Sequence, residues 1–135
     1  MADGVAAVRQ LLVAHAPLTA LVPAARIQAG VLPIGTTLPA ISIMSVSKVD
    51  RNIPNPGTYR HVVERVQVTV MASTYVSQKA VLAAVRKAAA DKFPTVSGII
   101  RVTVHTESTG PDFMDAEASI HMGSQDFRVT FSEAR

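Results

Sequence analysis

The stretch that decides the fold is residues 59–90, which read YRHVVERVQVTVMASTYVSQKAVLAAVRKAAA. Apolar and polar side chains alternate along its first half. The apolar positions of that half are Val62, Val66, Val68 and Val70. Only Glu64 interrupts this apolar face, so the pattern predicts one long strand, over residues 58–72, with one face buried.

The hydrophobic period then changes from two residues to that of a helix. The apolar positions after the change are Val81, Leu82, Val85, Ala88 and Ala89. They form the stripe of an amphipathic helix over residues 76–91. Because the connection is short, we expect this helix to fold back over the strand that precedes it.

The flanking segments supply a second helix and further strands. Asp3 predicts the N-cap of a helix that ends at Ala16, because Pro17 follows. Shorter patterns predict strands over residues 26–29, 40–48 and 99–106, the last with Ile100, Val102 and Val104 on one face. The C-terminal segment 118–132 predicts a strand interrupted near Gly123, with Phe127, Val129 and Phe131 inward.

These elements predict an α+β fold. We expect a mainly antiparallel sheet of about four to five strands with two helices packed on it. The chain, residues 1–135, is predicted to form a single domain with long hairpin loops.

The order of these elements resembles a known family. An alanine-rich N-terminal helix leads to residues 18–22 and 26–27, and the segment 38–41, LPAI, follows a turn. Then come RVQV at 65–68, a helix after ASTY at 72–75, and a closing DFRV at 126–129. This order resembles the tail-completion proteins of long-tailed bacteriophages, also called tail terminators or head-to-tail joining proteins, over nearly the whole chain.

The resemblance implies a structural protein of the virion rather than an enzyme. Such proteins form a ring, usually of six copies, on the head-proximal end of the tail tube. The implied partners are sibling copies, the tail tube protein and the connector or stopper of the head, with DNA only as the transiting genome. The implied location is the tail of the virion, with assembly in the host cytoplasm.

The amino-acid composition favours association with other copies and excludes some kinds of chemical site. Apolar residues make up 48% of the 135, but aromatic residues only 4%, with no tryptophan. A core of small aliphatic side chains makes extra burial through self-association plausible. No cysteine is present, which excludes disulfides and thiolate sites. No basic leader and no apolar run of ~20 residues occurs, so we expect no secretion and no membrane contact.

Motifs for catalysis are missing from the sequence. It holds no nucleophile elbow, phosphate-binding glycine loop, zinc-protease motif or dinucleotide fingerprint, and we expect no cofactor. One alternative is a metal-dependent hydrolase that uses His105, His121 and the carboxylates of residues 107–117. Another is a small basic protein associated with nucleic acid, given the net charge of +3.

Two polar segments are the candidate partner-binding loops. Residues 50–57 are dense in turn formers, and 107–117 are acidic and expected to be mobile unless a neighbour orders them. Each carries apolar side chains without a local core. The candidate contact residues are Ile53, Pro54, Asn55 and Pro56 in the first segment and Phe113 and Met114 in the second.

A third candidate is a group of basic side chains, expected to gather where the two long strands form a hairpin. Its members are Lys48, Arg51, Arg60 and Arg65. They would line a channel for the genome or contact an acidic neighbouring ring. The alternative is a solvated strand surface whose charges oppose edge-to-edge aggregation.

Overall fold

The predicted strand-to-helix unit is present in the computed structural model, which describes residues 2–33 and 35–135. Strand β3, Tyr59–Ala72, runs almost directly into helix α3, Tyr75–Ala89. Thr74 caps the helix by accepting a hydrogen bond from the Ser77 amide at 3.1 Å. The four valines of the apolar face are buried, and Glu64 is buried among them.

The strands form one six-stranded sheet with a mixed edge. The order is β1-β2-β3-β6-β4, and β5 pairs with β6 beyond the end of β4. The remaining strands are β1 (Ile27–Ala29), β2 (Ala40–Arg51), β4 (Ile100–Thr109), β5 (Phe113–Asp115) and β6 (Ile120–Ala134). Among the described strands, only β1 pairs in parallel. The α+β prediction is confirmed, with more strands than the four to five expected.

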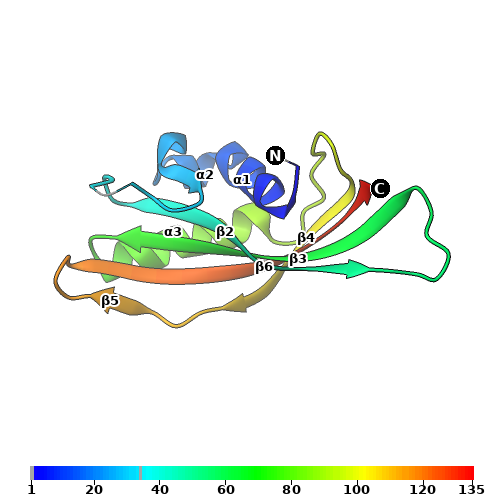
Figure 1. Cartoon of the computed structure of the whole chain (residues 1–135). Helices are drawn as coiled ribbons and strands as arrows, with labels where there is room; N and C mark the ends of the chain where they lie inside the picture. Colours follow the sequence, from blue (N-terminus) through cyan, green and yellow to red (C-terminus); the bar gives the residue numbers. More distant parts are fainter. Residues whose placement is uncertain (1, 34) are drawn as a thin grey trace.

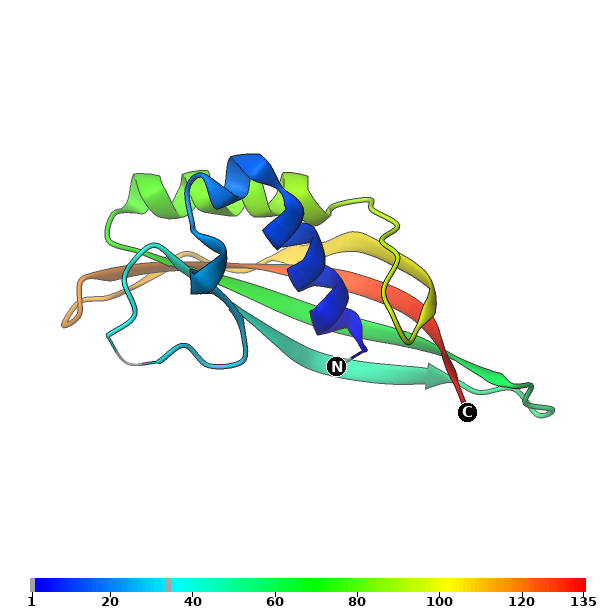
Figure 2. The same ribbon diagram turned by 90° about the horizontal axis from the view of Figure 1, so that it is seen from above.

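The helices cover one face of this sheet (Figures 1 and 2). Helix α1, Gly4–Ala14, begins at the predicted cap, where the Asp3 side chain accepts from the Ala6 amide. It ends before the predicted Ala16, and α2, Ala16–Thr19, starts afresh with Pro17 in its first turn. A 3₁₀ turn, Ala24–Arg26, leads into β1. No described helix is long and apolar enough to span a membrane.

The core lies between α1, α3 and the sheet face that they cover. Small aliphatic side chains fill most of it, and the two largest members, Phe127 and Phe131, come from β6. Both phenylalanines point inward as the alternation of the last strand predicts. No helix of the described residues lies on the opposite face of the sheet, which is called the open face below (Figures 1 and 2).

Two expectations for the C-terminal half are wrong. Strand β6 is continuous through Gly123, which pairs with Val70 in unbroken register. The irregularity lies in β4, where the register shifts between Ile100 and Thr103 and Arg101 has a φ of 55°. Because a bulge turns side chains away from strict alternation, Ile100 is 38% exposed instead of buried.

Strands β2 and β3 form a long hairpin that extends beyond the helices (Figures 1 and 2). They pair as far as Arg51 and His61, so the connecting loop is shorter than residues 50–57 predicted. From Met44 onward every residue of β2 is exposed. The outer half of this hairpin is called the arm below, and residues 52–58 are its tip.

Candidate functional site

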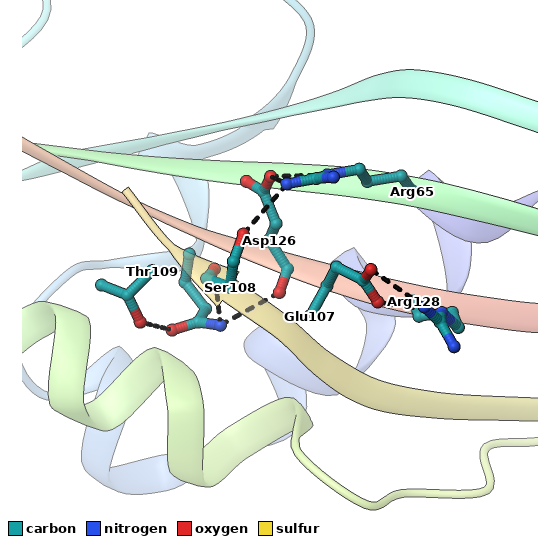
Figure 3. Close-up of polar contacts among 7 residues, drawn as sticks. Arg65, Glu107, Ser108, Thr109, Asp126 and Arg128 are labelled. Atoms are coloured by element: carbon teal, nitrogen blue, oxygen red, sulfur yellow. Dashed lines mark hydrogen bonds and ion pairs between the residues drawn. The ribbon is translucent and has the colours of Figure 1, made fainter. Parts of the chain in front are cut away.

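The open face carries a network of ion pairs that joins three strands (Figure 3). Arg65 of β3 donates from Nε to Asp126 Oδ2 of β6 at 2.7 Å and from Nη2 to Ser108 Oγ of β4 at 2.9 Å. Beside it, Arg128 binds both carboxylate oxygens of Glu107, at 2.8 and 2.9 Å. These contacts fix the relative positions of the strands, which suits a rigid assembly surface.

The four basic candidates do not gather in one patch. A register shift between Ser45 and Ser47 reverses the facing of β2, so Lys48 lies opposite Glu64 on the helix-covered side. Its Nζ is 3.9 Å from Glu64 Oε1 and 4.0 Å from Asp3 Oδ2. The sequence offers no signal for this reversal of Lys48. Arg60 and Arg65 lie five residues apart in one strand and face opposite sides of the sheet in any register, so the clustering prediction is wrong.

The other three basic candidates have different surroundings. Arg60 pairs with Glu133 at 3.4 Å, and Arg65 belongs to the network described above. Arg51 lies opposite His61 on the open face and makes no ion pair within residues 2–33 and 35–135. Arg51 is therefore the candidate whose charge is available to a partner.

The tip of the arm presents apolar surface to solvent. Ile53 is 60% exposed, and Pro54, Asn55 and Pro56 are exposed on either side of the turn. At the base of the tip, the Arg101 guanidinium lies 5.9 Å from the ring centre of Tyr59. An exposed branched side chain followed directly by a proline, which restricts its backbone, is the kind of rigid apolar knob that fits a partner's pocket.

The second candidate loop is largely strand. Glu107 belongs to β4, and Phe113 and Met114 belong to β5, where they pair with Met122 and His121. The two apolar side chains are 54% and 50% exposed. Because neighbours along a strand point to opposite faces, they offer apolar contacts on both sides of the sheet edge.

Asp112 holds this segment against helix α3, which sequence reasoning missed. Its carboxylate accepts from Tyr75 Oη at 2.8 Å and Gln78 Nε2 at 3.4 Å and pairs with Lys79 Nζ at 2.9 Å. The Lys79 hydrogen bond, followed by that of Tyr75, lowers the pKa of Asp112, and the same contact raises the pKa of Lys79. The partners lie more than thirty residues away in the sequence, so local patterns carried no signal for them.

An apolar groove on the open face was also missed. Its volume is about 600 Å³. The strand ends and connections that supply its lining lie at the end of the sheet opposite the arm (Figure 1). Its lining includes Val31, Leu32, Met44, Met71, Ala118 and Ile120. The run Val31-Leu32-Pro33 after β1 was the available signal, because two adjacent apolar residues in a connection need a covering surface. We call this feature the end groove.

The histidines considered for a metal site lie apart. His105 pairs with Asp91 at 2.7 Å, and His121 lies beside the Tyr75 ring at a centroid distance of 6.3 Å. In the sheet they are opposite Arg128 and Met114 rather than each other. Across the described parts of the chain, no three His, Asp or Glu side chains are arranged to hold a metal ion. His105 and His121 therefore do not come together as the metal site of a hydrolase would require.

Comparison with known proteins agrees with this architecture. A solved chain from the "Virion of native gene transfer agent (GTA) particle" shares the fold, with a TM-score of 0.69 and 20% identity over 93% of this chain and 91% of that chain. No curated protein matches. The model of the family "Tail completion protein gp17" matches residues 6–132. Because that match spans nearly the whole sequence, the chain belongs to the tail completion protein gp17 family, structural proteins of bacteriophage tail assembly.

Proposed function

We propose that this protein forms a ring on the head-proximal end of the phage tail tube, stops its polymerisation and provides the surface that joins the head connector. The family assignment over residues 6–132 is the observation that carries the proposal. Heterologous contacts that close into a ring leave no free end for further growth. Six copies is the number that the family resemblance implies.

The exposed apolar groups give this ring its contact surfaces. The tip around Ile53 and the Phe113–Met114 pair are both exposed, on segments held by the sheet. Of these, Phe113 and Met114 on β5 are the side chains that we assign to the tube or the connector. Binding through such surfaces meets the whole role, so we assign no catalysis, no cofactor and no DNA contact beyond passage of the genome.

Tail length tests this function directly. In cells that assemble the particles, omission of this protein is expected to give tubes longer than normal and heads without tails, because nothing blocks the growing end. Resupply of the intact chain restores uniform tails. Electron microscopy of the particles measures both, and normal, joined tails in its absence would refute the proposal.

Two variants locate the contact surfaces. Phe113→Asp with Met114→Asp keeps the β5 backbone pairing but places charge at the apolar edge. Deletion of residues 53–57 leaves a short connection between Arg51 and Tyr59, which an antiparallel hairpin accommodates. Both proteins should fold, as circular dichroism would show, yet give overlong tubes or unjoined heads.

A further inference from the structure

The two ends of the sheet carry complementary features. The arm projects from one end of the sheet (Figure 1) and carries the exposed Ile53. The residues that line the end groove on the open face belong to the other end. Strand β3, Tyr59–Ala72, spans the distance between them. Its 14 residues at ~3.3 Å each extend about 45 Å, so a tip cannot reach the groove of its own chain. Any contact between the two features joins different copies.

The charges at the two ends are also opposite. Basic side chains outnumber acidic ones around the arm, where Lys48, Arg51, Arg60, Arg101 and Arg135 lie with Asp50 and Glu133. Acidic residues lie where β5 leads through a turn to β6. They are Asp115 and Glu117, close in sequence to Ala118, which lines the groove. Among the described residues, neither Arg51 nor Glu117 forms an ion pair. Opposite unpaired charges at the two ends favour head-to-tail association of like molecules.

We propose that the end groove receives Ile53 from the arm of a second copy of this chain, with Arg51 of that arm beside Glu117. This inference rests on the proposed ring and names its subunit contact. Pro54 and Pro56 restrict the backbone around Ile53, which reduces the entropy lost on docking. The volume of about 600 Å³ accommodates a branched side chain together with the proline that follows it.

The contact is heterologous, because the tip and the groove are different surfaces. Each copy has one tip and one groove. Copies repeated around an axis therefore close into a ring in which every groove is occupied by the tip of a neighbour. The apolar groove is then covered in the assembly. A tip that met the tail tube instead would leave the groove and Glu117 unmatched, which makes the second copy the better occupant.

The absence of cysteine from the chain permits a clean cross-linking test. Full-length Ile53→Cys and Met44→Cys proteins are mixed with a short bismaleimide, and products are separated by mass. Heterodimers are expected in the mixture and not with either protein alone. Phe93→Cys, at a position 70% exposed elsewhere on the surface, replaces Met44→Cys as the control and should give no product.

Two results would overturn the contact. Absence of the Ile53–Met44 product from the mixture means that the tip docks elsewhere, including on the tube. Self-linking of Ile53→Cys alone means that two tips meet in a symmetric contact. A chain carrying both cysteines should give a ladder of multimers that ends at the size of the closed ring.

A charge exchange tests the polar part of the contact. Arg51→Glu in the arm protein, or Glu117→Arg in the groove protein, should each lower the cross-link yield about threefold to tenfold, as expected for loss of one interfacial charge pair. Combining both changes should restore most of the yield. If the two changes together lowered the cross-link yield by the product of their separate factors, the proposed Arg51–Glu117 pair would be contradicted.

Failure of this contact and failure of the proposed function give different results. Tails of normal length that require the protein, without the Ile53–Met44 product, would refute the contact and leave the function intact. Normal tails formed in its absence would refute the function, whatever the cross-linking shows.

Discussion

The Gly4 backbone amide donates a hydrogen bond of 2.9 Å to Glu64 Oε1, and this contact ties the first turn of α1 to the middle of β3. Glu64 has no exposed surface, and its other oxygen, Oε2, has no hydrogen-bond partner among the described residues. A carboxylate suits this position because the free N–H groups at a helix N-terminus favour negative charge. The residue that interrupts the apolar face is therefore the one that positions the helix.

Removal of this carboxylate should destabilise the protein. Glu64→Ala leaves the Gly4 N–H buried without an acceptor and opens a cavity, so we expect a loss of about 2–4 kcal/mol in the free energy of unfolding. Glu64→Gln keeps an oxygen acceptor and should cost about 1 kcal/mol or less, since the Lys48 pair is half-exposed and weak. Urea denaturation measures both, and equal losses for the two variants would contradict the dominance of the hydrogen bond.

The close approach of helix and strand also requires glycine at position 4. A Cβ there would lie 2.9 Å from Glu64 Cδ and Oε1. Gly4→Ala should therefore lower the free energy of unfolding by about 1–2 kcal/mol, although alanine is the better helix former. Gly57→Ala is the matched control, because none of the described residues lies within 4 Å of the Cβ that alanine would add, and it should change the stability by less than about 0.5 kcal/mol. Similar thermal midpoints for both variants would show that the close approach relaxes freely.

The strand and helix of residues 59–90 were predictable because each keeps one hydrophobic period along its length. The face of the sheet on which Lys48 lies could not be predicted in this way. Strict alternation from Ile41 and Ile43 puts Lys48 on the open face, but the register shift after Ser45 reverses that order. The outer half of β2 is exposed on both faces, Val46 and Val49 included, so the hydrophobic pattern could not locate the extra residue. Arg60 and Arg65 face opposite sides of β3 in any register, so the basic cluster was predicted where two faces exist.

The structure of residues 107–117 could not be predicted either, because it depends on contacts with residues that are distant in the sequence. Its polar composition predicted a mobile loop, yet strand pairing with β6 and the contacts of Asp112 order it. The predicted apolar pair, Phe113 and Met114, is exposed on that ordered edge. The run Val31-Leu32-Pro33 hinted at an apolar surface but not at the end groove, which forms only when the connection after β1 meets the turn before β6.

Acid should loosen the β4–β5 connection through Asp112. Its pKa is lowered by the Lys79 and Tyr75 hydrogen bonds, so its contribution is complete above the ordinary aspartate value of about 3.9 and disappears as the pH falls through the lowered pKa. Amide protection factors for Phe113, Met114 and Asp115 should therefore fall in acid before those of β3. Asp112→Asn should give low protection at neutral pH and remove the acid-dependent step. Protection that follows the rest of the sheet at every pH would rule out this role.

Gly123 is needed because Gln78 of α3 packs directly over it. Any Cβ at position 123 would collide with the Gln78 amide, which is fully buried and reaches Asp112 Oδ1. Gly123→Ala should therefore destabilise the protein by about 1–2 kcal/mol, because the buried Gln78 amide must swing away and lose its contact with Asp112.

A double-mutant cycle separates this collision from a general intolerance of the strand. Gln78→Ala creates a cavity and loses stability by itself, but it also makes room for a methyl group at position 123. The cost of Gly123→Ala should thus fall by at least about 1 kcal/mol in the Gln78→Ala background, as expected for residues in direct contact. Additive losses in denaturant unfolding would mean that glycine is needed for the backbone of β6 itself. Its regular pairing with Val70 argues against that explanation, since the register is unbroken there.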